Sequence, residues 1–291
     1  MNQKYKATGI VLKGSPLKES DRLVTVLTSE YGLVRAVAPG AKKHKSQLRG
    51  RTELFVTNEF LIIKGRSLDK IIQADTIYTY PGLSRDLGKL ATAQYLAELS
   101  LSLALSEQPQ TELYELLNEH LQRLEKLDRQ QSVYPNLTQA AFHLLAIAGI
   151  APEVYNCCLT QKPIAPDFNN PRWRVGFSFN SGGAIDLAVK KPDTQNVQNY
   201  NNKDSELSEE NTDDYYPTIN YKINSIELTI LQLLNNNSLP LTELTAWEKT
   251  LNISLETTWM RVEKILREYI QYQLGKPIRS AALVDNLYVE F

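Results

Sequence analysis

The sequence has few residues with which to build a metal or nucleophilic site, since only two cysteines and three histidines occur among 291 residues. The two cysteines, Cys157 and Cys158, are adjacent and cannot make a disulfide framework, which is typical of a reducing compartment. No stretch approaches the roughly 18 consecutive apolar residues of a membrane span, and no apolar segment follows the polar start of the sequence. We therefore expect a cytoplasmic protein with no membrane segment.

Common catalytic motifs are also missing. The sequence contains no Gly-x-x-x-x-Gly-Lys-Ser/Thr loop to cradle nucleotide phosphates and no His-Glu-x-x-His zinc motif. Its three histidines, His44, His120 and His143, are far apart in the sequence and offer no general base beside a nucleophile. The sequence therefore indicates a binding protein and not an enzyme, and we expect His120 to lie on the surface of a helix.

Charge is nearly balanced over the whole chain but not along it. The 32 Lys/Arg and 33 Asp/Glu residues give a net charge of -1. Residues 1–80 hold 14 of the basic and 7 of the acidic residues, a net charge of +7, which leaves -8 for the rest of the chain. Such asymmetry points to a basic module that binds nucleic acid, joined to a body with a different task.

The positive charge is concentrated in residues 39–51, Pro-Gly-Ala-Lys-Lys-His-Lys-Ser-Gln-Leu-Arg-Gly-Arg, which we call the basic segment. Its glycines and Ser46 predict a flexible loop that can follow a curved polyanion, where each neutralised phosphate releases condensed counterions. The alternative is a solvated loop that only keeps the protein soluble. The predicted DNA-binding residues are Lys42, Lys43, His44, Lys45, Arg49 and Arg51 of this segment, together with Arg35, Lys64 and Arg66.

Short apolar alternations separated by turn residues predict five β-strands in the first 80 residues. The predicted strands cover residues 7–12, 23–27, 33–38, 54–63 and 70–78. Five strands in this length fit a small Greek-key barrel of the oligonucleotide-binding (OB) type. An SH3-like barrel or a simple meander would give the same pattern, so the alternation alone leaves these alternatives open.

Other residues of this region have structural or binding interpretations. The tyrosines at positions 5, 31, 78 and 80 could stack on bases, but we expect about two in three of them to pack inside the protein. Residues 18–22, Lys-Glu-Ser-Asp-Arg, are expected to stabilise the entrance of a strand, with Glu19 and Asp21 pairing with nearby Lys and Arg side chains.

After the Pro-Gly pair at 81–82 the apolar period changes from two to three or four, which indicates a domain boundary near residue 80. Helices are predicted at 83–105, 109–127, 137–150, 225–235, 241–249 and 255–274, the last with Gly275 as its C-cap. The predicted fold class is therefore α+β, with a five-stranded barrel domain at 1–80 and a helical domain at 81–291.

Two segments interrupt the predicted helices. Residues 173–189 alternate around a Ser-Gly-Gly turn and predict a β-hairpin. Residues 190–221 are rich in Asn, Asp, Glu and Ser, and they predict a disordered insertion because they have little apolar area to bury.

Several strings of the sequence carry a family resemblance. They are Thr-Gly-Ile-Val-Leu at 8–12, Lys-Glu-Ser-Asp-Arg-Leu-Val-Thr-Val-Leu-Thr at 18–28, Pro-Gly-Ala-Lys-Lys at 39–43 and Tyr-Gln-Leu-Gly-Lys-Pro-Ile-Arg-Ser at 272–280. These strings resemble the RecO family of bacterial recombination mediators and DNA-repair proteins. The resemblance covers most of the chain outside residues 190–221.

The resemblance implies an OB-fold domain that binds single- and double-stranded DNA, and a protein that anneals complementary strands in the nucleoid. It also implies that the protein acts with RecR to load recombinase onto DNA coated by single-strand-binding protein (SSB). A protein-interaction scaffold that does not itself bind DNA is the alternative function.

A further implication is that the C-terminal tail of SSB, acidic and ending in Phe with a free carboxylate, docks on the helical domain. Such a ligand needs an apolar pocket beside a cation. The candidate cations, each close to apolar residues in the sequence, are Arg123, Lys126, Lys276 and Arg279.

The cysteines are where the sequence departs from part of this family. Many members bind zinc through two Cys-x-x-Cys pairs that bracket a hairpin like residues 173–189. Here Thr160 and Gln161 stand where the second thiolate of the first pair would fall, and no cysteine follows the hairpin. A structural zinc site normally takes four Cys/His ligands, so we expect no bound metal and no cofactor.

Overall fold

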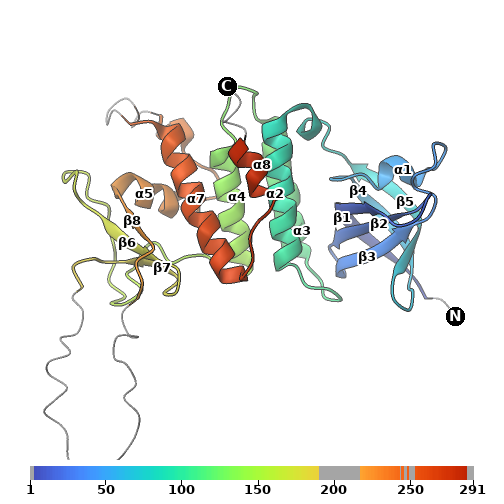
Figure 1. Cartoon of the computed structure of the whole chain (residues 1–291), viewed down its shortest axis with the longest axis horizontal. Helices are drawn as coiled ribbons and strands as arrows, with labels where there is room; N and C mark the ends of the chain where they lie inside the picture. The colour runs from blue at the N-terminus through green and yellow to red at the C-terminus, as the bar shows by residue number, and fades with distance from the viewer. Residues whose placement is uncertain (1–2, 190–216, 243, 246–247, 249–252, 287–291) are drawn as a thin grey trace, which may run out of the picture. The chain divides into compact units, whose positions relative to one another are not determined.

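The computed structural model describes residues 3–189, 217–242, 244–245, 248 and 253–286 (Figure 1). The chain divides into two compact units, one made of Met1–Gly149 with Leu266–Phe291 and the other of Ile150–Ile265. The change from strands to helices, which we predicted at residue 80, falls inside the first unit.

Five strands at the start of the first unit close into a barrel (Figure 1). They are β1 (Lys4–Pro16), β2 (Arg22–Thr28), β3 (Gly32–Ala38), β4 (Thr57–Ile63) and β5 (Asp69–Tyr78). Their order is β1-β2-β3-β5-β4, and β4 pairs with β1 to close the ring. A simple meander would place β4 beside β3, whereas here β3 lies parallel to β5. The order is that of an OB-type barrel, and the α+β class is confirmed.

The alternation of apolar residues fills the inside of this barrel, because successive side chains of a strand point to opposite faces. Each of the five strands contributes inward residues that are almost completely buried. The central ones are Val11, Val24, Val26, Val34, Ala36, Phe60, Ile62, Ile71 and Ala74. The alternation that predicts the five strands therefore also supplies the buried core of the barrel.

Strand β1 is about twice as long as the predicted segment 7–12. Its first half pairs with β4 and its second half with β2, and the register shifts between Val11 and Lys13. A β-bulge of this kind bends a strand and increases its twist. Because of this bend, β1 can pair with both β4 and β2, and this pairing closes the barrel.

Five of the described helices correspond to predicted ones: α2 (Leu87–Leu103), α3 (Thr111–Lys126), α4 (Tyr134–Ile147), α5 (Ser225–Leu233) and α7 (Leu255–Leu274). A further short helix, α8 (Ala281–Asp285), was not predicted. The single helix predicted at 83–105 is wrong at its start. A 3-10 turn, η1 (Leu83–Arg85), precedes Asp86, whose carboxylate accepts the backbone N–H of Lys89 at 3.0 Å and begins α2.

The expectation of a surface position for His120 is wrong. His120 on α3 is buried, and its Nε2 lies 3.0 Å from Nδ1 of His143 on α4. Burial, followed by the neighbouring His143, lowers the pKa of His120 to about 3. His120 is therefore neutral at neutral pH, and the two rings form a hydrogen-bonded contact between α3 and α4.

The second unit contains a small sheet in the order β7-β6-β8. Strands β6 (Val175–Ser178) and β7 (Gly183–Ile185) form the predicted hairpin. A third strand, β8 (Tyr221–Ile223), pairs with β6 and was not predicted, since it lies at the end of the segment that we expected to be disordered. Residues 217–220 of that segment are described as well, and Asn220 bonds to Phe177 and Phe179 of the hairpin, so the prediction of disorder is wrong for this part. Residues 190–216 lie outside the described residues, as does part of the helix predicted at 241–249.

The barrel is joined to α2 and α3 through the turn before β3. The N–H of Leu33 donates to the carbonyl oxygen of Leu105 at 2.9 Å, and the N–H of Gln110 donates to that of Ser29 at 2.8 Å. Gly32 adopts a φ of +63°, and a Cβ atom there would lie 2.0 Å from the Leu105 oxygen. Only glycine fits at this junction.

We expect Gly32→Ala to lower the free energy of unfolding by roughly 2 kcal/mol or more, because it combines a strained φ with a backbone clash. Gly50→Ala is the matched control. Gly50 lies in a helical turn with nothing within 4 Å of an added Cβ, so this change should raise stability by roughly 0.4–1 kcal/mol. Urea unfolding followed by circular dichroism measures both, and equal midpoints for the two variants would contradict the assigned junction.

Candidate nucleic-acid interface

The basic segment connects β3 to β4 and is ordered by its own backbone. The N–H of Lys43 donates to the carbonyl oxygen of Gly40 at 2.9 Å, and that of Ser46 donates to Lys43 at 3.1 Å. A four-residue helix, α1 (Leu48–Arg51), follows, and Ala41 and Leu48 are buried in the barrel core. The prediction of a freely flexible loop is therefore wrong, because two apolar side chains hold the segment to the barrel.

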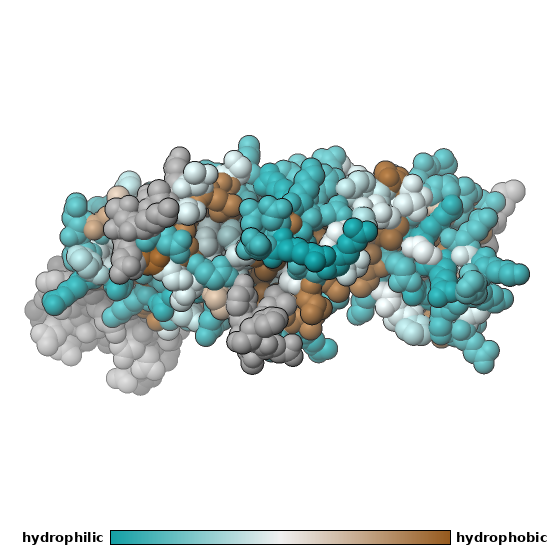
Figure 2. Space-filling model, turned by 90° about the horizontal axis from the view of Figure 1, so that it is seen from above, coloured by the Kyte–Doolittle hydropathy of each residue, from teal (hydrophilic) through white to brown (hydrophobic). Residues whose placement is uncertain are grey.

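Most charged side chains of the basic segment project into solvent. Lys42, Lys43, His44, Lys45 and Arg49 are all exposed. No carboxylate of the described residues lies within ion-pair distance of these four Lys and Arg side chains. In Figure 2, hydrophilic residues dominate the surface of the barrel at the right of the view. The ordered segment thus presents a cluster of cations without an ion-pair partner among the residues that the structure describes.

Two of the predicted DNA-binding residues form ion pairs with carboxylates of the protein itself. Arg51 donates to the carbonyl oxygen of Ala74 and lies 3.2 Å from the carboxylate of Asp75 on β5. Lys64 lies 3.3 Å from the carboxylate of Glu107. Arg51 therefore fastens the basic segment to the barrel, and Lys64 is partly neutralised.

The remaining predicted residues, Arg35 and Arg66, are exposed at other places on the barrel. Arg35 lies on β3, whose far end leads into the basic segment, and Arg66 lies in the turn between β4 and β5. The structure therefore divides the predicted set into a compact cluster on the basic segment and separate cations elsewhere.

The turn between β1 and β2 lies directly beside the basic segment. The N–H of Lys42 donates to the carbonyl oxygen of Ser20 at 2.9 Å, and the carboxylate of Asp21 accepts the N–H of Gly40 at 2.8 Å. This bond from Gly40 is the main cause that lowers the pKa of Asp21. The exposed Lys18 on this turn adds a cation that we did not predict, because only the tertiary contact reveals its position.

Residues 18–22 have the structural role that we expected, with different partners. Asp21 binds a backbone N–H instead of a basic side chain. Arg22 pairs with Glu53 at 2.8 Å and donates to the carbonyl oxygen of Thr52 at 3.0 Å. These contacts tie the β1–β2 turn and the end of the basic segment into one rigid end of the barrel.

The tyrosines divide between packing and exposure. Tyr80 is buried, and its hydroxyl donates to Asn118 Oδ1 on α3 at 2.7 Å. The Tyr5 hydroxyl donates to Asp69. Tyr31 and Tyr78 keep about two fifths of their surface exposed. Two tyrosines are thus tied into the structure, and two retain accessible rings.

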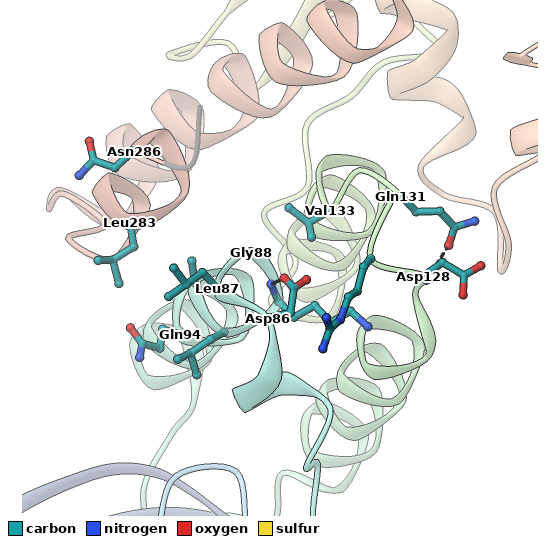
Figure 3. Close-up of a pocket in the computed structure, with 13 residues that line it drawn as sticks. Asp86, Leu87, Gly88, Gln94, Asp128, Gln131, Val133, Leu283 and Asn286 are labelled. Carbon is teal, nitrogen blue, oxygen red and sulfur yellow. Dashed lines mark hydrogen bonds between the residues drawn. The ribbon is translucent and has the colours of Figure 1, made fainter. Parts of the chain in front are cut away.

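A second candidate site is a cavity of about 890 Å³ in the first unit. It lies between the start of α2, the connection from α3 to α4, and α8 (Figure 3). Leu87 is 75% exposed at this cavity, and Leu283 of α8 points towards the start of α2. Figure 2 looks down on this end of the helices and shows hydrophobic residues gathered near the middle of the view.

The cavity also has a cation. Arg129, from the α3–α4 connection, lines it and is exposed, and no carboxylate of the described residues lies within ion-pair distance. Lys89 lines it too, but its Nζ donates to the carbonyl oxygens of Glu125, at 2.8 Å, and Leu127 near the end of α3. Arg129 is therefore a cation available to an anionic ligand, in a lining that combines apolar side chains with the carboxylates of Asp86 and Asp128.

The cations that we predicted for the SSB tail do not line this cavity. Arg123 pairs with Glu119 on its own helix, and the adjacent Leu124 is buried. Near the exposed Lys276 and Arg279, Ile278 is also buried. Of the apolar neighbours of these pairs, Leu124 and Ile278 thus face the core, whereas Leu127 is half-buried, and the assignment of the tail to either pair stays a prediction.

The hairpin of the second unit packs on the cysteines. Cys157 is buried, and its Sγ accepts the N–H of Asp186 at 3.3 Å, while the N–H of Cys158 donates to the carbonyl oxygen of Ala184. Within the described ranges, no group of three or more Cys, His, Asp or Glu side chains is arranged to hold a metal ion. The absence of zinc stays a prediction.

Among the described residues, no helix is both long enough and apolar enough to cross a membrane.

Comparison with known proteins covers both parts of the chain. The family model for the N-terminal domain of recombination protein O matches residues 1–80, and the model for its C-terminal domain matches residues 84–199. The DNA repair protein RecO of Gloeothece citriformis is 56% identical over 288 residues, covering 99% of this chain and 98% of the relative. Proteins of the same name from a Nostoc species and a Synechocystis species are 51% and 42% identical, each covering 99% of this chain and at least 97% of the relative. The chain therefore belongs to the RecO family of DNA repair proteins.

Proposed function

We propose that the barrel binds single- and double-stranded DNA through the basic segment. The observation that carries this proposal is the cluster of Lys42, Lys43, Lys45 and Arg49, which are exposed on a segment that core residues hold in place and have no carboxylate of the described part of the chain within ion-pair distance. Lys18 and His44 extend the cluster. Cations fixed in this way bind a phosphate backbone with little loss of conformational entropy, and the interaction does not depend on base sequence.

The remaining predicted residues have secondary roles in this proposal. Arg51 positions the segment through its pair with Asp75, and Arg35 and Arg66 are exposed cations outside the segment that a single strand can also reach. Lys64 contributes less, because Glu107 lies beside it.

The cellular function that fits these sites is recombination mediation in DNA repair. In this proposal the barrel holds DNA and anneals complementary strands, and the protein acts with RecR to load recombinase onto SSB-coated single strands. Membership of the RecO family supports the assignment, as does the presence of a cationic site on the barrel and an apolar cavity among the helices. In this proposal the protein binds DNA and partner proteins and brings them together, and it catalyses no chemical step.

Changing Lys42, Lys43 and Lys45 together to Ala should lower the slope of log Kd against log salt by about 2 on single-stranded DNA, at roughly 0.7 per lost phosphate contact. Affinity should fall to a similar extent for oligonucleotides of different sequence, because phosphate contacts carry no base information. Fluorescence anisotropy with labelled oligonucleotides over a range of salt concentrations measures both quantities.

The matched control changes Lys162, Lys222 and Lys264 to Ala, which removes the same charge from three exposed positions of the second unit. This control should leave the slope unchanged. Equal slopes for the two triple variants would contradict the assignment of the basic segment. A wild-type protein that binds no DNA at low salt would favour the alternative of an interaction scaffold.

We also propose that the C-terminal tail of SSB docks in the cavity between α2 and α8. The terminal Phe ring would lie against Leu87 and Leu283, and the carboxylate would bind Arg129. The proposal is supported by the exposed Leu87 and by Arg129, which has no carboxylate of the described residues within ion-pair distance; the predicted pairs, Arg123 with Lys126 and Lys276 with Arg279, are the alternative sites.

Arg129→Glu should weaken binding of a labelled SSB tail peptide about tenfold or more, since a charge-assisted bond is lost and repulsion is added. Leu87→Glu should have a similar effect, and DNA binding should be unaffected by either change. Amidation of the peptide's terminal carboxylate should reduce wild-type affinity and leave that of Arg129→Glu almost unchanged. If Arg123→Glu with Lys126→Glu, or Arg279→Glu, abolishes peptide binding while Arg129→Glu does not, the tail binds at a predicted pair instead.

A further inference from the structure

A cavity of about 540 Å³ lies at the end of the barrel where β3 begins. Residues from the starts of β1, β3 and β5, the end of β4 and the connection after α2 line it. Strand β3 leads from this cavity at Gly32 to the basic segment beyond Ala38, a span of about 20 Å at the rise of a β-strand. The cavity and the basic segment are therefore separate sites at the two ends of one strand.

Two aromatic rings meet at this cavity. The centroids of Tyr5 and Tyr31 are 4.8 Å apart, with an interplanar angle of 62°. Tyr5 is fixed, because its hydroxyl donates to the Asp69 carboxylate, which also accepts the N–H of Gly65 at 3.0 Å. Burial, and then the bond to Asp69, raises the pKa of Tyr5, so the hydroxyl stays a donor. An edge-to-face contact occupies at most one face of the Tyr31 ring, and this residue remains 40% exposed.

Charged and polar groups complete the lining. Arg35 is exposed here, and no carboxylate of the residues that the structure describes lies within ion-pair distance of it. Lys64 and Glu107 also line the cavity and pair with each other at 3.3 Å. Hydroxyl and amide side chains contribute further hydrogen-bonding groups. The cavity therefore combines a ring for stacking, polar groups for the edge of a base and a cation for a phosphate.

We propose that this cavity accepts one unpaired nucleotide of single-stranded DNA, with its base on Tyr31 and its phosphate at Arg35, and so makes the barrel prefer single strands over duplex. The inference rests on the proposed DNA-binding function but uses residues outside the basic segment. A base in a duplex is paired and stacked on its neighbours, and exposing it costs a few kcal/mol. Duplex DNA is therefore held by the basic segment alone, whereas a single strand reaches both sites.

The test compares Tyr31→Leu, which removes the ring, with Tyr31→Phe, which retains it. At one fixed salt concentration, Tyr31→Leu should weaken binding of a labelled oligothymidylate at least about fivefold, the effect of losing one stacked base. Binding of a duplex should change less than twofold, and Tyr31→Phe should match the wild type for both ligands. Arg35→Ala should reduce the salt slope on the single strand by about 0.7 and leave that on the duplex unchanged. Melting curves establish that the variants are folded.

A direct arm uses an oligonucleotide containing 5-iododeoxyuridine. Irradiation of the complex should crosslink the base to the peptide that contains Tyr31, as identified by mass spectrometry. Equal loss of single-strand and duplex affinity in Tyr31→Leu, or no loss in either, overturns the proposal. The same holds if Tyr31→Phe is as weak as Tyr31→Leu.

A free nucleotide carries the same base and phosphate as a nucleotide within single-stranded DNA, so binding of thymidine monophosphate must be tested as well. If it binds the wild type and not Tyr31→Leu, while oligonucleotide binding is the same in both, the cavity takes free nucleotides and the single-strand assignment fails. If the wild type binds DNA and substitution of Tyr31 does not change this binding, only this inference is overturned. No DNA binding by the wild type overturns the proposed function as well.

Discussion

The closure of the barrel by β1 is the constraint on which both barrel sites depend. β1 bends at the shift between Val11 and Lys13, so that it pairs with β4 in its first half and with β2 in its second. The closure brings the starts of β1, β3 and β5 together around Tyr5 and Tyr31 at one end. At the other end it sets the β1–β2 turn against the basic segment, where Lys42 bonds to Ser20 and Asp21 bonds to Gly40.

Ion pairs separate the cations of the barrel into two kinds. Arg22 pairs with Glu53 and Arg51 pairs with Asp75, and both ion pairs fasten the C-terminal end of the basic segment to neighbouring strands. Lysines on the exposed part of the segment have no carboxylate of the described residues within ion-pair distance. Exposed ion pairs contribute little stability individually, so the value of the paired arginines lies in holding the segment's geometry. The unpaired cations then supply the attraction for phosphate, and salt weakens it.

Local periodicity was sufficient to predict the five strands and most helices, because each follows from which side chains must leave water. It could not predict features set by contacts between distant segments. The long β1, the start of α2 at Asp86 and the burial of His120 beside His143 are of this kind. Strand β8 was missed because three residues carry too little pattern.

The candidate sites show the same division between local and tertiary information. The basic segment was evident from composition, but its order depends on Ala41 and Leu48 reaching the core. The pairing of Arg51 and the proximity of Lys18 are likewise tertiary. Arg129 was overlooked because nothing in the neighbouring sequence indicates that Leu87 and Leu283 lie beside it.

Hydrogen–deuterium exchange of the full chain, with and without a single-stranded oligothymidylate at low salt, tests most directly whether the barrel is the DNA-binding part. The account predicts slower exchange in residues 17–21 and 39–51, with a second protected region at 31–35, and unchanged exchange in residues 150–189 of the second unit. Protection confined to the second unit or to the helices, with the barrel unchanged, would contradict it.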